Sequence, residues 1–372
     1  MNGKPRTEKT KADRIEYIDV AKFIGIFLVV FAHLRRQERE TAWIDAFHRP
    51  LFFFLSGRTL KIRPEEGFYG FLKRKIHSYI IPYFVLSLVG ILVSVIALLI
   101  HNEASSLSLD FFVSQLVSRI EEKRYSSIWF VGCLFTSERF TYFLLWFGRK
   151  KFYFSFLPMS LFLTLAIVYN HYTPGFLIWS RDSAFFGTLY VFLGYTFCTK
   201  EFKKVHDFIL SDRIISLLNG LIGIGIVILV QEYLLKNYNN AHLSRWAAHF
   251  SPYYIVLPLA LLGCLSTVRI SYGISNPVRG KLGQMTLIIL AFQQSIGIPV
   301  YQKRAVNWSS AIGENTMWNL PWIGYTLVGT FFIITLSVPI YYFFLYTPLC
   351  VALNKKLPYS VSLLRKKDNG TN

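Results

Sequence analysis

The sequence predicts an all-α integral membrane protein with about ten transmembrane helices and with the N-terminus and the C-terminus both in the cytoplasm. Apolar residues make up 53% of the 372 residues and charged residues only 16%. Apolar runs long enough to cross a bilayer recur along the whole chain, a pattern that no soluble core requires. In the orientation given above, cytoplasmic segments hold 26 of the 40 Lys and Arg residues and outer segments hold 11. This asymmetry is typical of membrane proteins, so the net charge of +19 is attributed to topology and no nucleic-acid partner is expected.

The expected spans suit a bilayer in length and composition, with end errors of about two to four residues. They are 17–34, 47–61, 79–100, 127–147, 152–169, 184–198, 214–235, 251–268, 282–300 and 321–346. The second contains His48-Arg49-Pro50 and Gly57, so we expect an irregular or broken helix with a cavity beside it, because only protein or water can cover the freed backbone groups. One membrane domain, 17–346, between basic cytoplasmic tails, 1–16 and 347–372, is the simplest partition.

Three polar side chains mark the first span. Asp19, Lys22 and His33 are separated by three and eleven residues, so at about 100° per residue they share an arc of roughly 60°. Charged groups within a span usually face the bundle interior or a water-filled cavity. The alternative is an Asp19–Lys22 ion pair at the inner interface, with Lys22 snorkelling and His33 in the outer headgroup zone. The shared stripe keeps a functional site on this helix face in consideration.

The same stretch resembles a known family. RIEYIDVAKFIGIFLVVFAH, followed by FHRPLFFFLSG, is similar to the opening of the acyltransferase 3 family of integral membrane acyltransferases, and especially to its fucose 4-O-acetylase-like branch. The family's signature is a basic residue, ten intervening residues and a histidine, with an aspartate three residues before the basic one; Lys22, His33 and Asp19 occupy these places. FLKRKIHSYIIPY, SIWFVGCLFTSE and IWSRDSAFFGTLYVFLGYTF extend the resemblance over about residues 14 to 346. In LGQMTLIILAFQQ, Gln293 stands where the branch commonly has histidine, which leaves it a hydrogen-bonding role.

The resemblance implies an enzyme of the cell membrane that moves an acyl group, expected to be acetyl, from acyl-CoA to a hydroxyl of a surface or lipid-linked carbohydrate. No tightly bound cofactor is expected, and the four widely separated cysteines support neither a metal site nor a disulfide framework. His33 is the candidate base, because the unperturbed pKa of imidazole suits proton transfer near neutral pH. The rise from Lys22 to His33 is about 16 Å, comparable with an extended pantetheine arm.

Further candidates carry a structural alternative each. His48 is expected to share a cavity with His33 as a second base, an acceptor-sugar ligand or an acyl carrier, or else to be an interfacial histidine without a role. Glu138 is expected to orient a histidine or Lys22, or to form a structural ion pair. The residues expected to bind the coenzyme are Asp19, Lys22, Lys73, Arg74 and Lys75; the alternative for the last three is ordinary cytoplasmic charge. The residues expected to bind the acceptor are Arg49, Asp182 and Gln293; the alternative for Asp182 is a helix cap. A transporter of a glycan or lipid-linked sugar would use the same polar stripe as a pathway. The Lys22–His33 pattern with its basic loop favours the enzyme.

Overall fold

Every regular element in the described part of the chain is helical. The computed structural model describes residues 16–35, 38–100, 107–121, 128–149, 151–172, 180–210, 212–237, 253–311 and 320–355. The α-helices are α1 (Glu16–Arg35), α2 (Glu38–Asp45), α3 (His48–Thr59), α4 (Gly67–Lys75), α5 (Ile81–Ile100), α6 (Leu109–Glu121), α7 (Trp129–Phe147), α8 (Phe156–Tyr172), α9 (Arg181–Thr196), α10 (Lys203–Ile209), α11 (Arg213–Asn237), α12 (Tyr253–Gly273), α13 (Pro277–Gly283), α14 (Thr286–Phe292), α15 (Ile298–Arg304), α16 (Val306–Ala311) and α17 (Leu320–Tyr346). A helix satisfies its backbone polar groups internally, which is what an apolar segment requires in hydrocarbon.

Six helical segments among the described residues are long and apolar enough to cross a membrane. They are Glu16–Arg35, Gly67–Ile100, Phe152–Tyr169, Arg213–Asn237, Tyr253–Gly273 and Leu320–Tyr346. Each overlaps an expected span, although Gly67–Ile100 begins twelve residues before the expected 79–100. The other four expected spans correspond to α3, α7, α9 and the α14–α15 segment, which are short, charged or interrupted.

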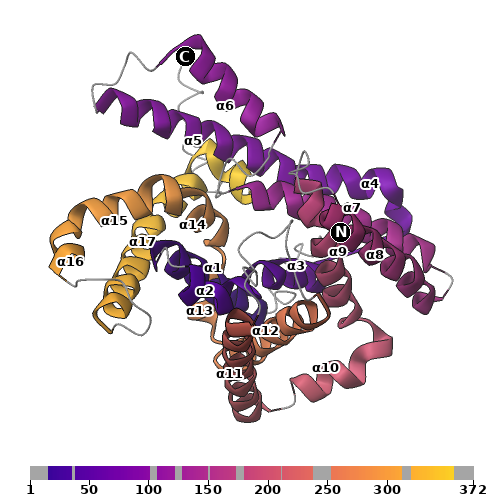
Figure 1. Cartoon of the computed structure of the whole chain (residues 1–372). Coiled ribbons are helices and arrows are strands. Elements are labelled where there is room, and N and C mark those ends of the chain that lie inside the picture. Colours follow the sequence, from indigo (N-terminus) through magenta and orange to yellow (C-terminus); the bar gives the residue numbers. More distant parts are fainter. Residues whose placement is uncertain are drawn as a thin grey trace, which may run out of the picture.

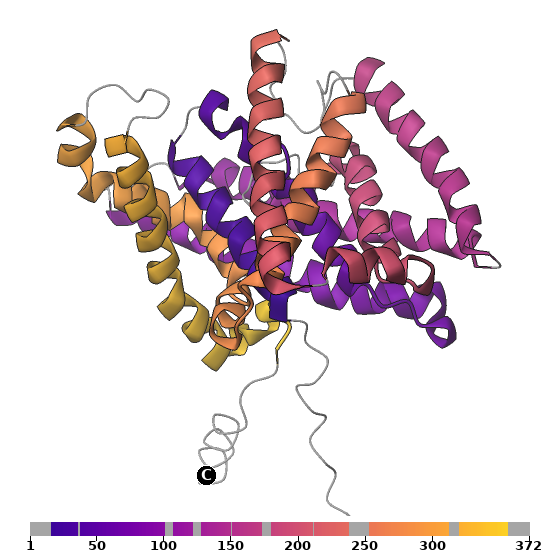
Figure 2. The same ribbon diagram turned by 90° about the horizontal axis from the view of Figure 1, so that it is seen from below.

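The outer surface of the bundle is apolar. On α11, for example, Leu218, Leu221, Ile222 and Leu229 are all more than half exposed. Soluble proteins rarely expose contiguous apolar patches of this kind, whereas lipid chains accommodate them. The fold is therefore that of an all-α membrane protein. Figure 2 shows α11 upright, with α1 (indigo) and α17 (gold) inclined to it.

The short helix α3 occupies the centre of the bundle, packed against α1, α9 and α12 (Figure 1). The expectation of an irregular or broken helix here is wrong. Pro50 is the third residue of α3, where its missing N–H has no intrahelical acceptor to lose. Gly57 does not break the helix either: a Cβ there would lie 2.0 Å from the carbonyl oxygen of Val191 in α9. Glycine is required because the two backbones touch.

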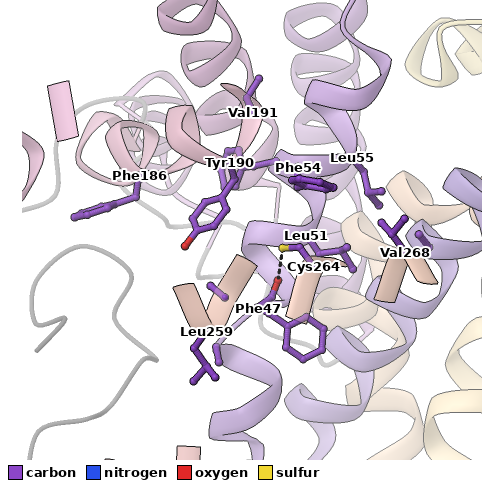
Figure 3. Packing of buried hydrophobic residues seen from close by; sticks show 14 of the residues in the cluster. Phe47, Leu51, Phe54, Leu55, Phe186, Tyr190, Val191, Leu259, Cys264 and Val268 are labelled. Carbon is purple, nitrogen blue, oxygen red and sulfur yellow. Dashed lines mark hydrogen bonds between the residues drawn. The ribbon is translucent and has the colours of Figure 1, made fainter. Parts of the chain in front are cut away.

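Apolar packing fixes α3 from several sides (Figure 3). Buried apolar side chains of α3 and of the residue before it pack against those of α9 and α12. They are Phe47, Leu51, Phe54 and Leu55, then Phe186, Tyr190 and Val191 of α9, and Leu259, Cys264 and Val268 of α12. The Cys264 thiol lies 4.0 Å from the carbonyl oxygen of Phe47, just before α3. A helix so enclosed holds its polar residues in fixed positions.

Two helical segments contain a π-helical turn, in which each backbone hydrogen bond links residues five positions apart. The first, Ile76–Ile80, joins α4 to α5, with the Ile81 N–H bonded to the Ile76 carbonyl. The second, Gln293–Gly297, joins α14 to α15 in the ninth expected span, with the Ile298 N–H bonded to the Gln293 carbonyl. Such turns locally re-aim side chains and occur frequently at functional sites.

Candidate active site

A cavity of about 800 Å³ lies in the bundle and receives side chains from α1, α3, the first π-helical turn, α7 and α14. Its α1 wall consists of Asp19, Lys22, Ile26, Val29 and His33. These positions advance by three or four residues, so they form one stripe of the helix. The structure thus places the three polar residues of the first helix on one cavity wall.

The α3 wall of the cavity consists of His48, Arg49, Phe52, Ser56 and Thr59. Helices α1 and α3 run antiparallel. At one end the Arg58 guanidinium donates a hydrogen bond of 2.5 Å to the Tyr17 hydroxyl. Further along, Gly25 leaves room for Phe52, whose ring would lie 2.9 Å from a Cβ at that position. Lys22 therefore lies toward one end of the cavity, and both histidines lie toward the other.

His48 has a defined tautomer. Its Nδ1 lies 2.9 Å from the carbonyl oxygen of Ile44, which can only accept a hydrogen bond, so Nδ1 carries the hydrogen. Asp45 Oδ1 is 3.5 Å from the same nitrogen and 3.8 Å from Arg49 Nη2. When the imidazole is neutral, its lone pair is consequently on Nε2. Sequence reasoning missed Asp45, although its spacing of one helical turn before His48 was a usable signal.

His33 has a different environment. Arg49 and the Gln293 side chain lie close to its imidazole. Gln293 is 0% exposed, and neither its amide atoms nor His33 Nδ1 has a hydrogen-bond partner among the described residues. A buried polar group without a partner is costly, by about 1–3 kcal/mol. Of these two residues only His33 lines the cavity and can meet a ligand there, whereas Gln293 lies behind it and Gln294 lines the cavity instead.

Glu138 lies behind the cavity wall and is 1% exposed. Lys75 Nζ is 2.6 Å from its Oε2 atom. Its Oε1 atom accepts a hydrogen bond of 2.8 Å from the Tyr79 hydroxyl and another from the Ser56 hydroxyl. The structure thus pairs Glu138 with Lys75, which agrees with the ion pair given as the alternative from sequence and not with an interaction with Lys22 or a histidine. Ser56 and Tyr79 line the cavity, whereas Glu138 and Lys75 do not.

The basic run expected at the coenzyme is divided in the structure. Arg74 Nη2 is 2.7 Å from Glu66 Oε2, and these hydrogen bonds hold the pKa of the Glu66 carboxyl below its ordinary value. Lys73 is exposed, and Lys75 pairs with Glu138 as described above. None of the three lines the cavity.

A second lysine accompanies Lys22 in the cavity. Lys355 was assigned to the C-terminal tail, but it lines the cavity and donates a hydrogen bond of 2.5 Å to the Tyr341 hydroxyl. The 3₁₀ segment Pro348–Leu353 before it packs against α17 and α5. Residues of the expected tail are therefore part of the folded domain. Asp182 is the second residue of α9, and its side chain lies outside the described part of the structure.

The cavity lies almost entirely within a region that matches a known family. A family model described as an acyltransferase domain matches residues 15–342, from the start of α1 into α17. No curated protein and no solved structure was found to match the chain. The match includes both histidines, Lys22 and the Glu138 cluster.

Proposed function

The chain belongs to this acyltransferase family, and from that premise we propose that it transfers an acyl group, specifically acetyl, from acyl-CoA to a hydroxyl of a surface or lipid-linked carbohydrate. One observation carries the proposal: a single cavity has cationic Lys22 toward one end and His33 and His48 toward the other. The rise between Lys22 and His33 is about 16 Å, comparable with an extended pantetheine arm.

The cation end suits the coenzyme's phosphates. Lys22 and Lys355 both line the cavity. Lys355 Nζ lies 3.4 Å from the side-chain oxygen of Gln284, whose neighbour Gly283 packs on Asp19. Ammonium groups bind phosphate through charge-assisted hydrogen bonds. Asp19 Oδ1 lies 3.5 Å from Lys22 Nζ and holds that lysine at the cavity wall. A volume of about 800 Å³ is within the usual range for cofactor-sized ligands. The donor would lie along the cavity with its thioester at the histidines.

The histidine end suits the chemical step. The acceptor hydroxyl oxygen attacks the thioester carbonyl carbon while an imidazole takes the hydroxyl proton. The tetrahedral intermediate then collapses, the carbon–sulfur bond breaks, and the thiolate leaves and receives the proton back from the imidazolium. His48 Nε2 has the lone pair that this step requires, and His33 faces the same cavity. Arg49, Asp182 and Gln293 are assigned to acceptor binding.

The finer topology is part of the same proposal. Ten crossings, including the short helices α3 and α9, with both termini cytoplasmic, place Lys22 near the cytoplasmic face, where acyl-CoA is available. The division of basic residues, 26 against 11, supports this orientation. In Figure 2 the start of α1 (indigo) and the segment after α17 (yellow) lie at the same end of the bundle, as the orientation requires. The membrane concerned is the cell membrane.

Calorimetric titration of coenzyme A into the purified protein tests the donor assignment. We expect Lys22→Ala to weaken binding and His33→Ala to retain it, because a neutral imidazole far from the phosphates offers them little. His33→Ala should instead lower acyl transfer by about 10²- to 10⁴-fold. Lys203→Ala, on the exposed surface of α10, is the matched control and should bind as the wild type does.

The same titration separates the enzyme from a transporter. A transporter of a glycan or lipid-linked sugar requires no saturable binding of coenzyme A. Failure of the wild type to bind coenzyme A would contradict the enzyme, and equal binding by the wild type and Lys22→Ala would remove Lys22 from the donor site.

A further inference from the structure

The cavity wall contains two hydroxyl groups whose hydrogens are both donated in hydrogen bonds to a residue behind the wall. Ser56 of α3 and Tyr79 of the first π-helical turn both donate to the same oxygen, Oε1 of Glu138. Their own oxygens are 3.5 Å apart, and both residues line the cavity. A hydroxyl group has one hydrogen and two lone pairs. Toward the cavity, therefore, Ser56 and Tyr79 can only accept hydrogen bonds.

This polarity is fixed from behind. The Glu138 carboxylate is held by Lys75 at 2.6 Å and has no hydrogen to offer in return. If either hydroxyl turned its hydrogen toward the cavity, a buried charged oxygen would lose a hydrogen bond, which is unfavourable. The Tyr79 ring lies 5.4 Å from Lys75 Nζ, so the cation also holds the ring in place. The four residues form a site that selects a hydrogen-bond donor in its ligand.

The position of this acceptor pair along the cavity identifies the ligand group. Ser56 follows His48 by eight residues on α3, a rise of about 12 Å. In an extended acyl-CoA, the amide nitrogen next to the pantoyl unit lies seven bonds from the sulfur, about 8 Å at about 1.2 Å per bond. The reacting carbonyl carbon lies one bond beyond the sulfur, about 10 Å from this nitrogen, and the base lies within about 3 Å of the attacking hydroxyl, so the span is near the rise along α3. That amide N–H is a hydrogen-bond donor at the right distance.

We propose that Ser56 and Tyr79 accept a hydrogen bond from the pantoyl amide N–H of the acyl donor, and that the Lys75–Glu138 ion pair is the device that positions them. The inference rests on the proposed function, since it assumes a pantetheine-bearing donor. It also explains why a buried carboxylate stands behind the cavity wall without reaching the histidines. Ser56 and Tyr79 are binding residues, and Glu138 and Lys75 act through them.

Affinity for a modified coenzyme tests the proposal. The probes are coenzyme A and an analogue in which an ester oxygen replaces the pantoyl amide N–H, each titrated by calorimetry into detergent-purified protein. The wild type should bind the ester about 2- to 13-fold more weakly, the effect of one neutral hydrogen bond. Ser56→Ala and Tyr79→Phe should bind coenzyme A more weakly by a similar factor and should discriminate less between the two probes.

Ser137→Ala is the matched control. Ser137 is the neighbour of Glu138 on α7, but its hydroxyl is bonded to the carbonyl oxygens of Cys133 and Ala184 and it does not line the cavity. This variant should keep both the affinity and the discrimination of the wild type. A purely structural role for Ser56 and Tyr79 would alter stability in their variants and leave the ratio of the two affinities unchanged.

Two results would overturn the inference, and they are distinguishable. Equal binding of both probes by the wild type, or full discrimination in both Ser56→Ala and Tyr79→Phe, rejects the acceptor pair while the binding of coenzyme A still supports the proposed function. No binding of coenzyme A by the wild type rejects the inference and the proposed function together. Chromatographic homogeneity and helical circular dichroism of each variant establish that it is folded.

Discussion

Replacing Lys75 by Met should destabilise the protein more than most single substitutions do. Lys75 is 7% exposed and Glu138 1% exposed, and their charged atoms are 2.6 Å apart. Methionine fills similar space without the charge, so the Glu138 carboxylate would keep only its two hydroxyl donors. Removing one partner of a buried ion pair costs about 3–5 kcal/mol, because the remaining charge stays out of water. We expect a loss of that size in the free energy of unfolding.

Unfolding in mixed micelles, with SDS as denaturant and intrinsic tryptophan fluorescence as the signal, measures this loss. The double variant Lys75→Met, Glu138→Gln removes both charges and should recover most of the stability, since a neutral pair has no buried charge to compensate. Lys203→Met, on the exposed surface of α10, should stay within about 0.5 kcal/mol of the wild type. The reasoning is refuted if Lys75→Met alone falls within about 1 kcal/mol of the wild type, or if the double variant is no more stable than the single one.

Three further outcomes are expected. Asp45→Asn should lower acyl transfer by at least about 10-fold and leave the binding of coenzyme A unchanged, because the carboxylate helps to orient His48 and stabilises its imidazolium form. Unchanged turnover in this variant would remove Asp45 from the site. Gly57→Ala should lower the free energy of unfolding by about 1–3 kcal/mol, since its Cβ would meet a backbone carbonyl of α9, whereas Gly90→Ala, with open space around it, should not; equal effects in the same micelle titration would contradict this packing. Reporter fusions should place both termini and the segment 58–76, which includes α4, in the cytoplasm, and a C-terminal reporter active only outside the cell would contradict the ten-span topology.

Features that depend on local pattern could be predicted from the sequence. Long apolar runs gave helices close to their expected limits, as in Glu16–Arg35 for 17–34 and Leu320–Tyr346 for 321–346. The stripe of Asp19, Lys22 and His33 follows from the helical repeat alone, and the cavity lies on that side of α1. The prediction failed for α3, where Pro50 and Gly57 were interpreted as helix breakers. Proline is tolerated in a first turn, and glycine is also the residue that two touching helices require.

Features that depend on distant neighbours were decided by the tertiary structure. The partner of Glu138 is Lys75, more than 60 positions away in the sequence, and nothing in the spacing distinguishes it from Arg74, which turns to Glu66 instead. Lys355 enters the cavity because the segment before it packs back onto α17 and α5. Local hydrogen bonding and hydrophobic periodicity act between residues a few positions apart, so a single sequence displays them directly. Which buried charge meets which partner depends on how whole helices pack against one another. The packing energy is spread over many contacts between segments that lie far apart in the sequence.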